Sequence, residues 1–503
     1  MDAGLRKIPW ARVWVAAAVL IGVAVLIAVL LVTNRLPAAA PVPAPAPTPR
    51  ATPAAGPVTS ESLRAAIGAD GIHRHLEALA RIAAANGGNR AAGSPGDRAS
   101  AEYVLAQLRA AGYEPRTEEL RVPRYVVRRP PVLTPVGGAA LIPDRDLTLL
   151  QLSASGSGQA RVVPVDLTIP PGGQPSTSGC EAADFAGFQR GDVALLQRGT
   201  CPFRVKVERA QAAGAVAAVV LNDGGPGRRE LLRGSLGEPG PRIPAFGVSY
   251  EAGERLAATR PVVRFTADTV SEQAVTRNVI AETPGGRADR VVMVGAHLDS
   301  VEEGPGINDN GSGVATVLEL ARALAGRETT SKVRFAWWAG EELGLLGSRQ
   351  HAQRLPPAEV RRISLYLNLD MVASPNYTRF VYSPDGAPRG SAAVAGVLNG
   401  WFASQGQATR PVDFGPRSDH ASFAARGIPV GGLFSGAEGA KRPGDVAGSG
   451  GTAGRPADPC YHQACDGLGN VSRRALDELG DGAAHALATL AADTTPVDRQ
   501  RSP

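Results

Sequence analysis

The sequence predicts an α/β protein: a mixed, mainly parallel sheet sandwiched by helices, with a β-rich insertion and an N-terminal transmembrane helix. Three observations lead to this prediction. Residues 13–32 form one uncharged apolar run, and short apolar segments broken by Pro and Gly fill residues 113–269. After Asn278, strand-like and helix-like segments alternate, which is the βαβ order of parallel sheets. A chain of 503 residues has room for two or three domains.

The apolar run Val13–Val32 would span about 30 Å as a helix, which matches the thickness of a bilayer core. Arg6, Lys7 and Arg12 precede it, so the positive-inside rule leaves the N-terminus in the cytoplasm. We therefore expect a single-pass protein of the cell membrane with its folded part outside the cytoplasm. The alternative is a cleaved signal peptide and a secreted protein.

Composition and pattern set the expected domain boundaries. Pro37–Pro57 is mostly Ala and Pro, which predicts an extended spacer. The expected units are a stub with membrane anchor at 1–35, a linker at 36–59, a main domain at 60–120 and 273–495, an insertion at 121–272, and a tail at 496–503.

Apolar periodicity predicts the individual elements. The main domain is expected to contain helices at 75–85, 99–111, 314–324 and 344–354, and strands at 291–296, 333–338 and 363–369. Within the insertion, strands are expected at 192–196 and 216–221, with a helix at 205–213 between them.

The net charge of +6 does not indicate a nucleic-acid partner. Lysine occurs only at positions 7, 206, 332 and 441, and the arginines are spread along the chain without basic runs or interleaved aromatic residues.

The four cysteines, at 180, 201, 460 and 465, fit two short-range disulfides in an extracytoplasmic protein. The alternative is a pair of metal-binding thiolates.

Polar residues follow the predicted strands of the main domain, where open parallel sheets bind their ligands. His297 follows the first strand and Asp309 lies in the Gly-rich loop beyond it, Glu341 and Glu342 follow the second, and Asp370 follows the third. His462 lies in a later segment. Two histidines and several carboxylates form a donor set that zinc accepts.

Two of these positions predict distinct tasks. Two divalent cations close together need a bridging anion, and Asp309 is the natural candidate. Adjacent Glu341 and Glu342 point in different directions, so one can bind metal while the other faces the reacting water. Alone, this acidic pair also fits the first turn of a helix.

The sequence resembles the M28 family of zinc exopeptidases, especially bacterial secreted aminopeptidases, over residues 76–113 and 278–490. The segments carrying the resemblance are 82–90 (IAAANGGNR), 295–300 (GAHLDS), 308–313 (NDNGSG), 340–344 (GEELG), 368–371 (NLDM), 417–420 (RSDH) and 460–466 (CYHQACD).

The resemblance implies a zinc exopeptidase fold that hydrolyses the N-termini of peptides or proteins with two Zn²⁺ ions. One ion would bind His297 and Asp370, and the other Glu342 and His462, with Asp309 bridging them. Glu341 would be the general base, Tyr461 would help to stabilise the oxyanion, and Cys460 and Cys465 would form a disulfide around His462.

The insertion resembles a protease-associated (PA) domain. The likeness rests on Cys180, residues 191–199, Cys201-Pro202-Phe203 and residues 210–223. It implies a lid or substrate-access element, and the alternative is a passive spacer.

Competing functions are a zinc carboxypeptidase of the same superfamily, a non-catalytic receptor-like protein and a single-zinc glutaminyl cyclase. A carboxypeptidase needs a cation for the substrate's C-terminal carboxylate, and Arg417 is the candidate substrate-binding residue. Asp477, Glu478 and Asp481 could hold calcium, but a solvated helix face is the preferred interpretation. His420 is expected to shape the cleft, because no Gly-x-Ser-x-Gly elbow accompanies it.

Overall fold

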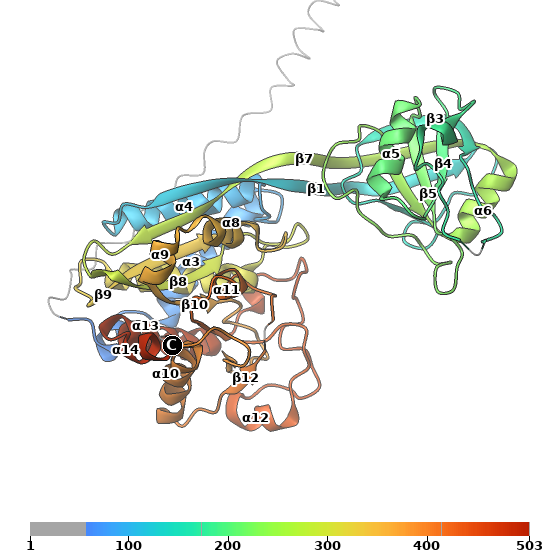
Figure 1. The fold of residues 1–503 in the computed structure, drawn as a ribbon. Helices are drawn as coiled ribbons and strands as arrows, with labels where there is room; N and C mark the ends of the chain where they lie inside the picture. Colours follow the sequence, from blue (N-terminus) through green and yellow to red (C-terminus); the bar gives the residue numbers. More distant parts are fainter. Residues whose placement is uncertain (1–56, 173, 414, 502–503) are drawn as a thin grey trace, which may run out of the picture. The chain divides into compact units, whose positions relative to one another are not determined.

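The computed structural model describes residues 57–172, 174–413 and 415–501 (Figure 1). The predicted membrane anchor and most of the predicted linker lie outside the described residues. Within the described ranges, no helix is both long and apolar enough to span a bilayer.

The main domain is built on a mixed, mainly parallel sheet, as predicted. The order along the sheet is β12-β11-β13-β10-β8-β9-β7, and β13, β10, β8 and β9 run parallel to one another. The strands are β7 (Val262–Glu282), β8 (Arg287–His297), β9 (Ser331–Trp338), β10 (Ile363–Leu369), β11 (Phe380–Tyr382), β12 (Arg410–Val412) and β13 (Val430–Phe434). The strands expected at 291–296, 333–338 and 363–369 are all present.

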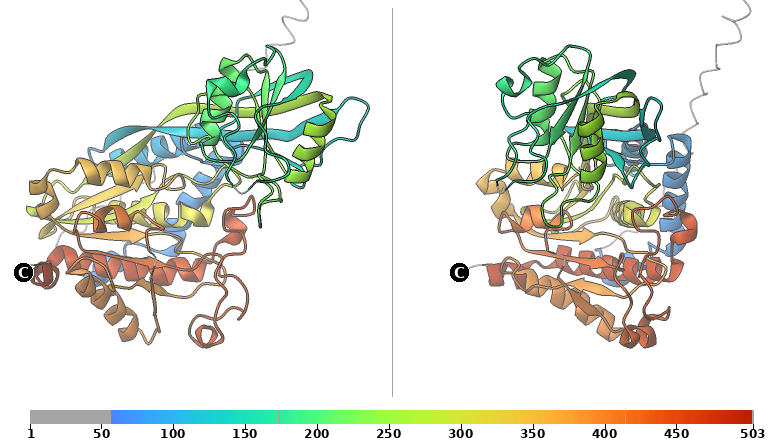
Figure 2. Two further views of the ribbon diagram at one scale, coloured as in Figure 1. Left: turned by 45° about the vertical axis from the view of Figure 1, so that its right-hand side comes forward. Right: turned by 90° about the vertical axis from the view of Figure 1, so that its right-hand side faces the viewer.

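Helices cover both faces of this sheet because alternate side chains of each strand point to opposite sides. On β8, Val292 and Val294 join the larger core, whereas Val291 and Met293 join a second core on the opposite face. The larger core packs α2 (Ser60–Arg64), α3 (Ala69–Ala85), α4 (Pro95–Ala110), α7 (Gly313–Leu324), α10 (Ser391–Ser404), α13 (Arg473–Ala492) and α14 (Thr495–Arg501). The other face carries α8 (Leu346–Arg354), α9 (Pro357–Arg362) and α11 (His420–Ala424), as the views in Figure 2 allow the reader to follow.

The strands of the insertion continue the sheet beyond β7, and the insertion has its own apolar cores. Its strands follow the order β7-β3-β4-β5-β6-β2, with two cores that include Leu195 and Leu196 on opposite faces of β4. Its elements are β2 (Leu147–Leu149), β3 (Gly156–Pro164), η1 (Ala182–Phe185), β4 (Val193–Gln197), α5 (Phe203–Ala212), β5 (Ala217–Leu221), β6 (Ala245–Val248) and α6 (Tyr250–Thr259).

The prediction of only short strands in the insertion region was wrong at its two ends. β1 (Arg116–Pro135) and β7 pair antiparallel as two long strands, and both run through the expected boundaries near residues 120 and 272. β1 pairs only with β7 among the described strands, so an edge position tolerates Pro123, Pro130 and Pro131. The pairing register shifts between Arg129 and Val132, where two of these prolines lie.

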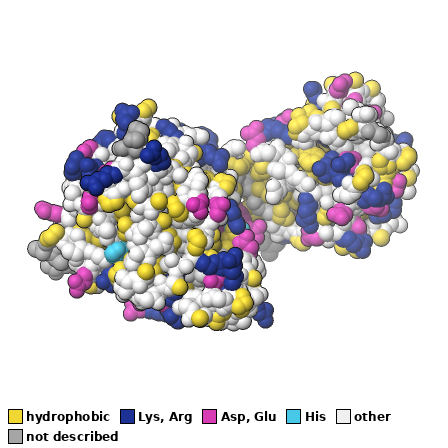
Figure 3. Space-filling view, turned by 60° about the horizontal axis from the view of Figure 1, so that its bottom comes forward, with side chains coloured by type: hydrophobic (Ala, Val, Ile, Leu, Met, Phe, Trp, Pro, Cys, Tyr) yellow, Lys and Arg dark blue, Asp and Glu magenta, His cyan; other side chains and the backbone are white. Residues whose placement is uncertain are grey.

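Figure 3 shows how charged side chains are distributed on one face of the molecule. On the face drawn in Figure 3, Lys and Arg side chains are spread among Asp and Glu side chains.

Candidate metal centre

The carboxyl ends of three neighbouring parallel strands bring the predicted polar residues to one edge of the sheet. His297 is the last residue of β8, Glu341 and Glu342 follow β9, and Asp370 follows β10. Asp309 arrives from η2 (Ile307–Ser312) and His462 from a loop just before η3 (Leu468–Asn470). All five predicted ligands and Glu341 line one pocket.

The carboxylate of Asp309 lies between two groups of side chains. Its Oδ1 is 3.2 Å from His297 Nε2, which is itself 3.3 Å from Asp370 Oδ1. Its Oδ2 is 3.2 Å from His462 Nε2, which is 3.1 Å from Glu342 Oε2. The two groups of potential metal ligands are therefore His297 with Asp370 and Glu342 with His462, and they share Asp309.

The spacing of these atoms fits zinc. Tetrahedral Zn²⁺ with bonds of about 2.0–2.1 Å holds its ligand atoms about 3.3 Å apart, close to the separations in both groups. One further acceptor, Glu342 Oε1, is buried without a hydrogen-bond partner among the described residues. The donor set and its geometry therefore suit a pair of zinc ions.

Glu341 stands beside both groups. Its side chain is buried, and burial raises its pKa well above the ordinary glutamate value, with Asp370, Asp419 and Glu342 adding to the shift and His297 opposing it. Burial and the charge of Asp309 likewise raise the pKa of Glu342 to about 7. Bound cations would oppose these shifts and favour the ionised form of the carboxylates.

Buried polar residues behind the pocket orient its side chains. The carbonyl of Asp299 lies 3.1 Å from His297 Nδ1, which directs Nε2 of the ring into the pocket. The carboxylate of Asp299 accepts the backbone N–H groups of Glu341 and Glu342 at 3.1 and 3.3 Å. Ser418 Oγ donates to Asp370 Oδ2 at 2.6 Å, leaving Oδ1 toward His297.

Arg90 holds the loop that leads to Asp309. Its fully buried guanidinium donates to the carbonyls of Leu298, Pro305 and Gly306, the second of these at 2.9 Å. Sequence reasoning included Arg90, Asp299 and Ser418 in the resembling segments but assigned them no role. Only the His-x-Asp spacing of Asp299 offered a signal, because the partners of Arg90 are backbone groups far away in sequence.

Tyr461 and Arg417 border the pocket as predicted. The ring of Tyr461 stacks on the imidazole of His462, with centroids 3.8 Å apart. The exposed guanidinium of Arg417 lies 3.0 Å from Glu438 and also hydrogen-bonds Tyr461.

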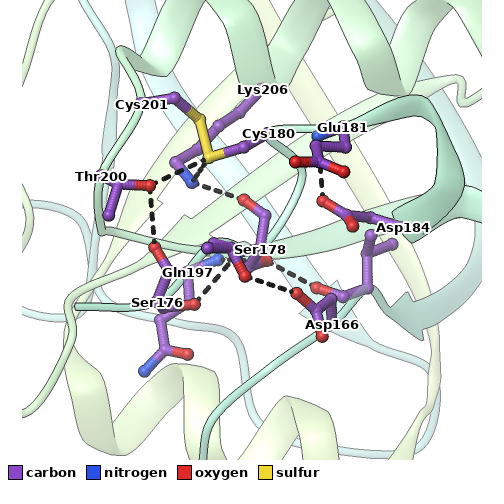
Figure 4. The surroundings of a disulfide bond; sticks show 12 residues. Asp166, Ser176, Ser178, Cys180, Glu181, Asp184, Gln197, Thr200, Cys201 and Lys206 are labelled. Carbon is purple, nitrogen blue, oxygen red and sulfur yellow. Dashed lines mark hydrogen bonds between the residues drawn. A yellow bond between two sulfur atoms is a disulfide. The ribbon is translucent and has the colours of Figure 1, made fainter. Parts of the chain in front are cut away.

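Both cysteine pairs form the expected disulfides, so the alternative of metal-binding thiolates was wrong. Cys460 and Cys465 close a short loop around His462. Cys180 and Cys201 close a loop in the insertion, where Figure 4 shows the ammonium of Lys206 pointing toward the carbonyl of Ser178 and the sulfur of Cys180.

Two of the three acids considered for calcium, Glu478 and Asp481, form ion pairs. Glu478 is 2.7 Å from Arg379, and Asp481 is 3.5 Å from Arg64. Asp477, the third of these acids, is exposed.

Comparison with known proteins identifies the family. Residues 278–487 match the family described as Peptidase family M28. An aminopeptidase from Pseudomonas aeruginosa (strain UCBPP-PA14) is 42% identical over 448 residues, which cover 86% of this chain and 82% of that protein. The chain belongs to peptidase family M28.

A second relative, a solved structure and a domain match are also similar to this M28 peptidase. The probable lipoprotein aminopeptidase LpqL of Mycobacterium tuberculosis is 38% identical, over 86% of this chain and 87% of that protein. The solved structure of an aminopeptidase from Aneurinibacillus sp. strain AM-1 matches with a TM-score of 0.57 and 26% identity, over 86% of this chain and 96% of that chain. Residues 159–256 match the PA domain, which confirms the second resemblance.

Proposed function

We propose that this M28 peptidase is an aminopeptidase that removes N-terminal amino acids from peptides with the help of two zinc ions. The observation that carries the proposal is the position of Asp309, whose two carboxylate oxygens each belong to a separate group of nitrogen and oxygen donors. His297 and Asp370 would complete one site, and Glu342 and His462 the other. The relatives from P. aeruginosa and M. tuberculosis, both named as aminopeptidases, support the same reaction.

When bound, the zinc ions would lower the pKa of a water molecule and polarise the scissile carbonyl. The protein's own residues would supply the proton transfers. The carboxylate of Glu341 takes a proton from the attacking water and passes it to the nitrogen of the leaving amine. The hydroxyl of Tyr461, which lines the same pocket, donates a hydrogen bond to the oxyanion.

The charges around the pocket favour a substrate's N-terminus over its C-terminus. Arg417 is the one Lys or Arg among the described residues that line the pocket, and Glu438 already pairs with it. A carboxypeptidase would need a free cation there. A substrate ammonium group instead meets Glu341 and Asp370, which face the same space.

A second cavity adjoins the metal centre and suits the side chain of the first residue. It has a volume of about 330 Å³ and shares Arg417, Phe434 and Ala437 with the metal pocket. Phe380 and Phe434 pack 5.7 Å apart in its wall. Charged residues, among them Arg410, Asp413 and Arg442, also line this cavity, so it offers both apolar and charged surface to that side chain.

The test uses the purified extracytoplasmic part, with and without a zinc chelator, on three versions of one peptide beginning with leucine. The peptides have a free N-terminus, an acetylated N-terminus, or a free N-terminus with an amidated C-terminus. We expect chelator-sensitive release of leucine from the first and third peptides and none from the second. Release of C-terminal residues, with loss of activity on the amidated peptide, would establish the carboxypeptidase alternative.

We further propose that residues 121–272 are the inserted PA domain, and that the folded part lies outside the cytoplasm, anchored by residues 13–32 or released. The two disulfides support an oxidising location. The likeness to a protein named as a lipoprotein aminopeptidase agrees with a place at the cell surface.

A further inference from the structure

The loop that carries His462 is fastened to the loop that carries Asp309 through one buried carboxylate. Asp466 is 2% exposed. Its Oδ1 accepts the backbone N–H of Asn308 at 2.9 Å, and its Oδ2 accepts the backbone N–H of Asp309 at 3.0 Å. Its backbone carbonyl accepts the N–H of Ile307, also at 3.0 Å. Asp466 thus fixes three successive residues of the loop that leads to the shared carboxylate.

A second contact secures the other end of the His462 loop. Asp458 Oδ1 accepts the N–H of Cys460 at 2.8 Å, and Asp458 Oδ2 accepts Nδ2 of Asn308 at 2.6 Å. Asn470 Nδ2 donates to both acids, at 2.8 Å to Asp458 and 3.0 Å to Asp466. Both ends of the disulfide loop are therefore tied to Asn308, the neighbour of Asp309: the Asp466 end through the backbone N–H of Asn308 and the Asp458 end through its side-chain amide.

The two groups of proposed ligands depend on different supports. His297 is the end of a central strand, its side chain is 2% exposed, and Arg90 and Asp299 hold its surroundings. His462 lies in a loop, its side chain is 39% exposed, and its φ of 57° is in the left-handed region that L-residues disfavour. The His462 loop therefore needs an external attachment to keep its conformation.

We propose that Asp466 is a positioning residue that couples His462 to Asp309 and selectively stabilises the metal ion held by Asp309, Glu342 and His462. The inference rests on the proposed two-metal site. In this role Asp466 touches neither metal nor substrate. It sets the distance between two ligands that come from loops more than 150 residues apart in sequence.

The variant Asp466→Asn tests this coupling. An asparagine offers a single oxygen, so its amide nitrogen would face one of the two backbone N–H groups and leave that donor without an acceptor. Zinc binding is measured by equilibrium dialysis against buffered free zinc and elemental analysis, with circular dichroism to confirm folding. We expect the ion held by Asp309, Glu342 and His462 (the second ion) to bind about 10- to 100-fold more weakly, as is usual when the support of a ligand is removed. The ion held by His297, Asp309 and Asp370 (the first ion) should keep its affinity.

Two reference variants show whether the loss of zinc is specific to the site that contains His462. His462→Ala removes the second site directly, so Asp466→Asn at limiting zinc should match it in stoichiometry. Glu478→Gln removes a partly buried carboxylate on α13 that pairs with Arg379, and should bind both ions like the wild type. Saturating zinc should restore kcat in Asp466→Asn with an unchanged KM.

Other outcomes overturn the proposal. Wild-type binding of both ions by folded Asp466→Asn, or equal weakening of both ions, would contradict the selective role while leaving the two-metal site intact. A wild-type protein that binds one zinc ion would refute the two-metal site and this inference together. Should Asp466→Asn fail to fold, Asn470→Ser retains both acids but removes a donor to Asp466, and must weaken the same ion to a smaller degree.

Discussion

Asp309 and Glu341 are both buried carboxylates in the same pocket, yet their different surroundings suit them to the different tasks that we propose for them. Asp309 has a histidine ring nitrogen at each oxygen, and hydrogen bonds and charges from His297 and His462 outweigh its burial and lower its pKa. Glu341 has carboxylates as neighbours, and its pKa is raised. A group that stays ionised suits a bridge, and a group that gains a proton readily suits a base.

We predict that Glu341→Ala keeps both zinc ions and loses about 10²- to 10⁴-fold in kcat, because proton transfer is lost and metal binding is not. Zinc content and steady-state kinetics on a leucine substrate measure this. Asp309→Ala is the contrasting variant, which should lose metal. An active, metal-replete Glu341→Ala protein would refute the assignment of the base.

The buried ammonium of Lys206 should make the stability of the insertion depend on pH. Burial lowers the pKa of this ammonium from 10.5 to about 8, so the unfolded chain binds more protons than the folded chain between those two pH values. Stability contributed by this group therefore rises with pH across that interval. Compared with Lys206→Met, the wild type should gain about 2 kcal/mol in free energy of unfolding between pH 8 and pH 10.

Urea unfolding of both proteins at several pH values measures the difference. The four cysteines are all paired, so no free thiol is present to start disulfide exchange at high pH. A difference between wild type and Lys206→Met that stays constant with pH would contradict the prediction.

At the scale of elements, the disulfide between Cys460 and Cys465 closes the short loop that carries His462. Its cysteines are five residues apart, and closing a loop of this size is worth about 2 kcal/mol in the chain-entropy account. We predict that Cys460→Ser with Cys465→Ser lowers kcat/KM at limiting zinc by about tenfold, the low end of the loss seen when a ligand's support is removed. Excess zinc should restore it.

The matched control is Cys180→Ser with Cys201→Ser, which opens the other disulfide in the insertion. That pair should leave the zinc dependence of activity on a short substrate unchanged. Equal effects from both pairs would show a general loss of stability instead of a local role at His462.

Elements differ in how far the sequence predicts them. The strands that end at His297, Trp338 and Leu369 were predictable because burial on both faces makes each of them largely apolar. β1 was not, because its prolines read as strand breaks and only its position at an edge makes them harmless.

In the candidate metal centre, the proposed ligands were predictable from the sequence, whereas the residues that support them were not. Its proposed ligands follow predicted strands or lie in motif-like loops, where residue type alone points to metal chemistry. The supports Arg90 and Asp466 act on backbone groups of distant loops, and no local pattern reports those partners. Tertiary structure is needed to find them.

At the scale of the whole molecule, the insertion enters and leaves the main domain on two paired strands. Val127 pairs with Thr269, so replacing residues 128–268 with Asn-Gly would close the ribbon with a two-residue turn. The main core consists of residues outside that segment, so we predict that the shortened protein folds and binds zinc.

A cavity of about 380 Å³ beside Glu342 is lined by Leu343, by Tyr125 of β1 and by Leu152 of the insertion. We therefore expect the shortened protein to cleave a leucine chromogenic substrate within about threefold of the wild type, and to change its relative activity on long peptides. Rates on peptides of 2 to 20 residues measure this selectivity. The same size dependence as the wild type would identify the insertion as a spacer.

The span of chain that builds the metal centre also sets when the enzyme can become active. Arg90 supports the loop before Asp309 from near the N-terminal end of the fold, whereas His462 and Asp466 lie close to its C-terminal end. A growing chain cannot complete the centre until almost all of it has been synthesised. The order of biosynthesis therefore makes the proposed metal centre one of the last parts of the fold that can form.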